Sequence, residues 1–171
     1  MVNQNFINLM SLHGLFSTGY IKKVKKTDGS DTKIRSTIFI DLNMFSYNKQ
    51  TYYDMTKGSS TSGLVTFGLG SGTKEPSIDD FSLESVFADN VFTVETFNYN
   101  VENNSYKPKY MFTIIYKYTG ADTITISEVG MFTKLAQTND DYAAIMLARE
   151  VLETPITVSN NDIFTVTMTI N

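Results

Sequence analysis

The sequence predicts an all-β protein, an antiparallel β-sandwich preceded by a short N-terminal helix. Short runs of strand-forming residues recur along the chain, separated by turn residues, as in sandwich domains. The 171 residues include 12 Phe and 10 Tyr, and aromatic residues favour strands. The final run, residues 163–170, alternates apolar residues with Ile163 and threonines without error. The length favours one sandwich domain over residues 1–171 rather than two domains.

The N-terminal segment, residues 1–14, has the spacing of an amphipathic helix. Phe6, Leu9 and Met10 recur at helical intervals, and Gly14 is a typical helix stop. This stripe packs on the protein's own core or on a neighbouring subunit, so it is a candidate assembly surface. His13 is the sole histidine, for which we expect a structural or surface role.

Residues 19–43 predict a β-hairpin that turns at Asp28 and Gly29. Basic residues cluster on it. One interpretation is a solvated edge hairpin whose lysines prevent pairing with other chains. The other is an electrostatic contact with phosphate or with an acidic partner. The candidate contact residues are Lys22, Lys23, Lys25 and Lys26.

Two loops are expected before the second half of the chain. Residues 54–63 are rich in Ser, Thr and Gly and predict a flexible loop. A short strand over 64–67 then leads into a glycine-rich loop that lacks the GK[ST] ending of a phosphate-binding loop, so we expect a structural turn. Its shaping residues are Gly68, Gly70, Gly72 and Pro76. A capping-box pattern at residues 77–80 predicts a short helical turn through Phe81 and Leu83.

The second half predicts five strands. Residues 100–108 are expected to form the loop of the first hairpin. In the second strand, Phe112, Ile114, Tyr116 and Tyr118 share one face. The expected strands are 91–99, 109–118, 123–133, 142–152 and 163–170.

Glu128 is the most informative charge because it lies within an apolar run. Antiparallel pairing that sets Met131 opposite Met146 also sets Glu128 opposite Arg149. We expect a structural ion pair that fixes strand register. The alternation changes parity between Ile126 and Val129, which predicts a β-bulge around Ser127 and Glu128. We expect Gly130, just after it, to be a structural turn or loop residue.

The composition excludes most catalytic chemistries. Zero Cys and one His leave no thiolate nucleophile, zinc–thiolate site or histidine-rich metal centre. The adjacent carboxylates at 79–80 and 140–141 lie in turns, where such pairs are usually caps or surface charges. We therefore expect no enzyme activity, no catalytic residue, no metal and no cofactor. The net charge of −4 argues against a broad basic face for nucleic acid, and the chain lacks the long apolar run of a membrane span.

Three segments resemble a known family. GLGSGTKEPSIDDFSLE, SEVGMF and AIMLAREVLETPITV, followed by the alternating final strand, look like the β-rich structural proteins of tailed bacteriophages. The matching positions are Gly70, Gly72, Pro76, Asp79 or Asp80, Leu83, Glu84, Glu128, Val129, Gly130, Met131, Leu147, Ala148 and Arg149. The resemblance covers residues 64–170; the N-terminal helix and the basic hairpin match nothing shared by that family.

The resemblance implies a virion protein without catalytic residues, made in the bacterial host cytoplasm. Its partners would be further copies of itself in a ring and other neck or tail proteins, with no sequence-specific nucleic acid and no membrane. The alternative is a capsid decoration or fibre protein that binds host-surface glycan, for which the ten tyrosines and the polar loops would be suited.

Overall fold

The computed structural model describes residues 1, 4, 22–34, 65–87, 91–104, 107–136 and 142–170. The regular elements within these ranges form eight β-strands, and the predicted all-β class is confirmed. They are β1 (Lys22–Lys25), β2 (Asp31–Ile34), β3 (Val65–Gly70), β4 (Phe92–Asn104), β5 (Lys107–Tyr118), β6 (Ile124–Ala136), β7 (Tyr142–Val158) and β8 (Ile163–Ile170).

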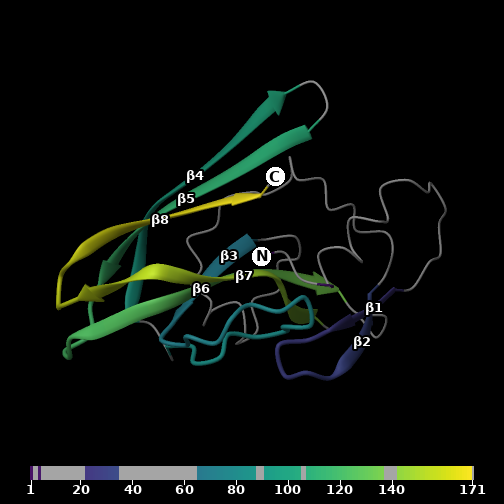
Figure 1. Cartoon of the computed structure of the whole chain (residues 1–171), viewed down its shortest axis with the longest axis horizontal. Helices are drawn as coiled ribbons and strands as arrows, with labels where there is room; N and C mark the ends of the chain where they lie inside the picture. The colour runs from purple at the N-terminus through teal and green to yellow at the C-terminus, as the bar shows by residue number, and fades with distance from the viewer. Residues whose placement is uncertain are drawn as a thin grey trace.

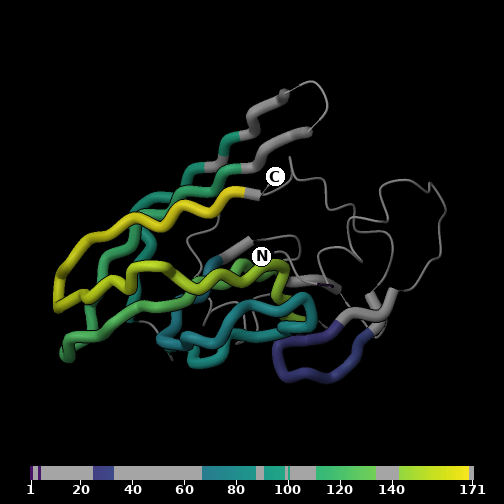
Figure 2. Tube along the Cα trace, in the orientation of Figure 1, coloured from purple at the N-terminus to yellow at the C-terminus, as the bar shows by residue number. Residues whose placement is uncertain are grey.

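The strands form two antiparallel three-stranded sheets and a separate hairpin. One sheet has the order β3-β6-β7 and the other β4-β5-β8, while β1 pairs only with β2 among the described strands. The two sheets form two layers in Figure 1. From the turn that joins them at the left of Figure 2, β7 and β8 diverge, so the last two strands belong to different layers.

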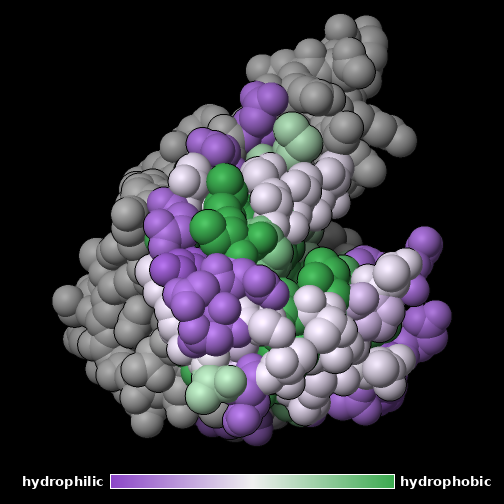
Figure 3. Space-filling model, turned by 90° about the vertical axis from the view of Figure 1, so that its left-hand side faces the viewer, coloured by the Kyte–Doolittle hydropathy of each residue, from purple (hydrophilic) through white to green (hydrophobic). Residues whose placement is uncertain are grey.

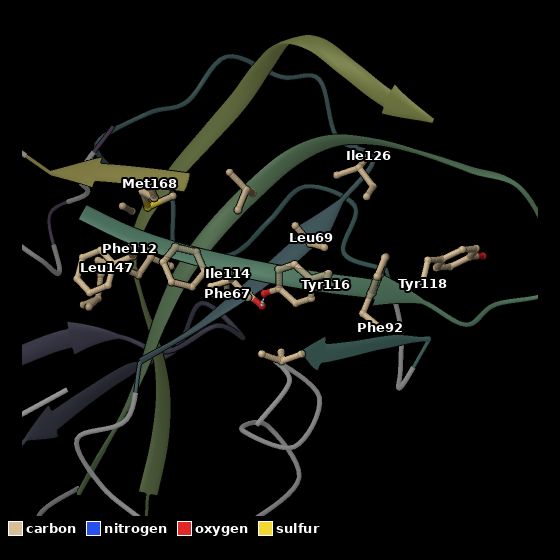
Figure 4. Close-up of a cluster of buried hydrophobic side chains, with 14 of the residues drawn as sticks. Phe67, Leu69, Phe92, Phe112, Ile114, Tyr116, Tyr118, Ile126, Leu147 and Met168 are labelled. Atoms are coloured by element: carbon tan, nitrogen blue, oxygen red, sulfur yellow. Dashed lines mark hydrogen bonds between the residues drawn. The ribbon is translucent and has the colours of Figure 1, made fainter. Parts of the chain in front are cut away.

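The core lies between the two sheets. Phe67 and Leu69 of β3 meet β5 residues there, and Figure 4 shows side chains from both sheets in one layer. The β5 face predicted from alternation is confirmed: Phe112, Ile114, Tyr116 and Tyr118 are all buried. The Tyr116 hydroxyl donates a hydrogen bond of 3.2 Å to the Phe67 carbonyl, which satisfies its polar end inside the core.

The final strand is confirmed at its predicted bounds, residues 163–170. Met168 is buried and Phe164 and Val166 are half-buried, whereas Thr165, Thr167 and Thr169 are exposed. Strand β8 pairs with β5 without any shift in register.

One predicted loop and one predicted strand end are wrong. Residues 100–108 are not a hairpin loop, because β4 and β5 remain paired up to Asn104 opposite Lys107. The segment is rich in Asn, which is frequent in turns, but the backbone ladder of an antiparallel pair forms with polar residues as well. Similarly, β7 continues to Val158, well beyond residue 152.

The glycine-rich region also differs from expectation. Gly68 and Gly70 are strand residues of β3, opposite Gly130 and Glu128, rather than loop residues. The capping-box pattern forms a single turn in which Asp80 N–H donates to the Ser77 carbonyl, and no helix follows in residues 81–87. The helix predicted for 1–14 and the loop predicted for 54–63 lie outside the described residues, apart from residues 1 and 4.

The predicted basic hairpin is confirmed in its core, β1 and β2, with its turn at Asp28 and Gly29. Gly29 has a φ of 81°, a conformation that glycine adopts without strain. The turn lies against another segment, since a Cβ at Gly29 would be 3.0 Å from the Phe81 ring.

Candidate functional site

A β-bulge turns Glu128 away from the core. The β6–β7 register shifts between Ile126 and Glu128, as the break in alternation predicted. Ile126 and Val129 therefore both face the core, while Glu128 lies on the outer side of the β3-β6-β7 sheet. It is nevertheless fully buried there, with an exposed fraction of 0%, because residues 71–87 cover this face.

Both carboxylate oxygens of Glu128 are saturated. Oε1 accepts hydrogen bonds from the backbone N–H groups of Gly72, at 3.1 Å, and Ser85, at 2.8 Å. Oε2 accepts from the backbone N–H of Glu84, at 3.1 Å, and from Arg149 Nε, at 2.8 Å. Four donors around one carboxylate offset the large cost of removing its charge from water.

Arg149 is the centre of the charge cluster, with an exposed fraction of 2%. Its Nη1 donates to Asp80 Oδ2 at 2.9 Å, and its Nη2 lies 3.9 Å from Glu84 Oε2, beyond hydrogen-bond distance. Burial acts to lower the pKa of Arg149, but the hydrogen bonds to Glu128 and Asp80 outweigh it and raise that pKa. The guanidinium is thus permanently charged and neutralised locally. We call Asp80, Glu84, Glu128 and Arg149 the clasp.

The clasp also organises the backbone of residues 71–87. Glu84 Oε2 accepts the N–H groups of Lys74 and Thr73 at 2.9 and 2.8 Å, and these bonds lower the pKa of Glu84. Asp80 Oδ2 accepts the N–H of Ser77 at 2.8 Å in addition to its bond from Arg149. The carboxylates of Glu84 and Asp80 therefore stabilise turns within residues 71–87, and both also lie close to Arg149 of β7.

Glycines allow this close approach. A Cβ on Gly72 would lie 2.5 Å from Glu128 Oε1 and 2.6 Å from Glu84 Cβ. A Cβ on Gly130 would lie 2.9 Å from Leu83 Cδ2, and Leu83 forms a small apolar cluster with Phe132 and Met146 beside the clasp. Both positions therefore exclude any side chain without a rearrangement.

The predicted ion pair is present, but the predicted register is wrong. Gly130 lies opposite Arg149, and Glu128 lies opposite Val151. The pairing next to the loop is already one residue from the predicted one, since Phe132 lies opposite Met146, and a register shift between Met131 and Phe132 adds a second residue. Arg149 reaches Glu128 diagonally along the sheet, which its long side chain permits.

Asp80 and Glu84 were not expected in this ion-pair network. The pattern at residues 79–80 predicts a cap or a surface charge, and Asp80 is both a cap and an ion-pair partner. The only sequence indication was the spacing of Asp80, Leu83 and Glu84 in the family-like segment. The segments 68–84, 127–132 and 144–158 all contribute residues to this one site.

The other predicted site residues are not part of the clasp. Pro76 lies in the covering segment. Lys25 lies over the Phe81 ring, with Nζ 5.4 Å from its centroid, and Lys26 pairs with Asp28 at 3.2 Å. Lys22 and Lys23 belong to β1, but the structure does not describe their side chains. Phe6, Leu9 and Met10 lie outside the described residues, so their assembly role remains a prediction.

The comparisons with known proteins add no relative. No protein-family model matches the chain, and neither a search of curated proteins nor a search of solved structures gives a match. Among the residues that the structure describes, no group of three His, Cys, Asp or Glu side chains is arranged to hold a metal ion. The same residues contain no helix that is long and apolar enough to cross a membrane.

Proposed function

We propose that this protein is a non-enzymatic structural subunit of a tailed-bacteriophage virion that forms a homo-oligomeric ring in the neck, collar or tail assembly. The clasp is the observation that supports this proposal best. The first segment of the family-like pattern is far in sequence from the other two, yet all three meet in one network around buried Glu128 and Arg149. Their common purpose is therefore structural, as expected for residues that define a fold.

The chemistry of the clasp also suits a structural role. A general acid or base must expose an atom to the group that gains or loses the proton. Glu128 offers no such atom, because it is fully buried and each oxygen already has two donors. The arrangement instead fixes residues 71–87 on the sheet and so presents a rigid outer surface to neighbouring subunits.

The oligomeric state of the purified full-length protein tests this proposal. We expect native mass spectrometry to give one discrete multimeric mass, and electron microscopy to show closed rings. The proposal would be contradicted if the purified protein formed no ring, either by itself or after mixing with neck and tail proteins. Genes for a portal or another neck protein beside its own would support the proposed position in the particle.

A glycan array separates this function from the alternative of a capsid decoration or fibre protein. A ring subunit gives no saturable signal with host-surface glycans. A saturable signal without ring formation would replace the proposed function with glycan binding.

A further inference from the structure

The outer edge of β8 pairs with none of the strands that the structure describes. Among the described strands, β8 ends its sheet and only β5 pairs with it. Tyr118 N–H donates to the Asp162 carbonyl, and backbone groups of an antiparallel strand point alternately to its two sides. The N–H and C=O groups that point away from β5 therefore belong to Ile163, Thr165, Thr167 and Thr169.

This edge lacks the features that protect other edges in the molecule. The outer strand β4 has a register shift beside Glu95. Strand β7 includes Pro155, and Met1 already occupies part of its edge by exchanging backbone hydrogen bonds with Arg149. Strand β8, in contrast, contains no charge, proline, glycine or register shift. A regular, uncharged edge of this kind readily pairs with another strand.

An apolar hollow follows the same edge. A cavity of about 690 Å³ lies between β8 and the opposite sheet. Figure 3 shows the surface hollowed between two layers, with hydrophobic residues exposed within it. Leu152, Ile156, Phe164 and Val166 line the cavity and are only half-buried. An added strand would cover these apolar groups and gain their burial.

We propose that β8 pairs antiparallel with β8 of a second copy of this chain, about a two-fold axis at Val166. This register pairs Thr165 with Thr167 and Ile163 with Thr169, so all four residues with outward backbone groups form the new ladder. It also sets Phe164 opposite Met168, so apolar side chains meet apolar side chains over the hollow.

The strand pattern identifies a second copy as the occupant. The alternation is complementary to itself under a two-fold rotation, as an isologous interface requires. Uncharged threonines would face each other on the outer side, where Thr113 and Thr167 already pair across β5 and β8 with oxygens 3.4 Å apart. The result is a continuous six-stranded sheet made of two copies of β4-β5-β8.

The dimer goes beyond the proposed function and does not depend on it. A ring built from such dimers has an even number of copies. A dimer without a ring would refute the ring and leave this inference intact, whereas a ring with an unpaired β8 would do the reverse.

Cysteine cross-linking tests the register directly, because the chain contains no cysteine. Facing residues in this type of strand pair have Cα atoms about 5.5 Å apart, which a disulfide can span. We expect mild oxidation of mixed full-length Thr165→Cys and Thr167→Cys proteins to give a disulfide-linked dimer, and neither protein alone to do so. Absence of the mixed dimer would overturn the proposed pairing.

Sedimentation velocity tests the interface without cross-links. Thr165→Lys combined with Thr167→Lys places four like charges at the dimer axis and should lower the sedimenting mass, to half for a wild type that is a dimer. Thr167→Pro, which removes one outward N–H, should weaken association with an unchanged circular dichroism spectrum. Thr125→Lys is the matched control, an exposed threonine on the central strand β6, and should keep the wild-type mass. A wild-type monomer at tens of micromolar, or a mass unaffected by the lysines, would refute the dimer.

Discussion

The clasp and the outer edge of β8 use polar groups in opposite ways. In the clasp, Glu128 and Arg149 are buried, and the Glu128 oxygens are saturated by donors from residues 71–87 and from β7. At β8, uncharged threonines lie beside backbone groups that no described strand pairs. The first region is closed and determines where residues 71–87 lie. The second is open and is suited to a contact between molecules.

This difference predicts that changes in the clasp affect the stability of the fold, whereas changes at β8 affect association between molecules. A buried ion pair that loses one partner leaves an uncompensated charge, so changes in the clasp act on stability. Surface changes at an exposed strand edge usually alter stability little, so changes at β8 act on association. The following experiments measure the stability side of this comparison, from the largest expected effect to the smallest.

Replacing Arg149 by methionine should have the largest effect. Methionine fills similar space but leaves buried Glu128 and half-buried Asp80 without their cation. We expect a loss of about 3 to 5 kcal/mol in the free energy of unfolding, measured in urea. The neighbouring Glu150→Gln removes an exposed charge and is the control, with an expected change below about 0.5 kcal/mol. Equal effects of the two variants would contradict a structural role for the arginine.

Substituting Gly72 by alanine tests the close approach. The new Cβ would meet both the Glu128 carboxylate and Glu84 Cβ, so the covering segment must shift. Overpacking of this kind costs about 1 to 3 kcal/mol, which urea denaturation resolves. Alanine at the adjacent, exposed Thr73 is the matched comparison. If Gly72→Ala is no less stable than Thr73→Ala, the contact is looser than the structure indicates.

Changing Tyr116 to phenylalanine tests a polar group in the apolar core. The change removes the hydrogen bond to the Phe67 carbonyl but keeps the aromatic ring. We expect a loss of about 0.5 to 1.5 kcal/mol by thermal or urea unfolding, smaller than that of Arg149→Met. A loss as large as that of Arg149→Met would mean that the clasp is not the dominant polar feature.

The pH dependence of Glu84 should give the smallest effect, because its side chain is exposed. Its pKa in the folded protein lies below its ordinary value, since it accepts the N–H groups of Lys74 and Thr73. Its stabilising contribution is therefore present above the unfolded pKa of about 4.3 and is lost as the pH falls through the folded pKa. Glu84→Gln should lower the urea midpoint at pH 7, and the difference from wild type should shrink on acidification. A constant difference would refute this role for its charge.

Much of the fold was predictable because local alternation determines strand faces. The β5 stripe, the β8 pattern and the bulge near Glu128 each follow from which neighbouring residues are apolar. The Glu128–Arg149 pair was predictable because isolated charges in apolar strands need partners. Its register was not, because both faces of the strand are buried and apolar near Met131 and Phe132. The pattern there fixes neither the pairing next to the loop nor the shift between these two residues.

The rest of the clasp depends on long-range contacts. Asp80 is 69 residues from Arg149 in the sequence, and the turn that contains it is typical of a surface cap. Burial of that turn depends on Leu83 packing against Phe132 and Met146 of two other strands. Similarly, residues 100–108 have the composition of a loop, but the ladder between β4 and β5 extends through their polar sequence.

Amide hydrogen exchange tests the central claim, that the clasp holds residues 71–87 on the sheet. The N–H groups of Gly72, Glu84 and Ser85 donate to buried Glu128, whereas those of Thr73 and Lys74 donate to exposed Glu84. We predict that the first three exchange as slowly as amides of central strand β6, and that the other two exchange faster. Fast exchange at Gly72, Glu84 and Ser85 in the folded protein would contradict the account.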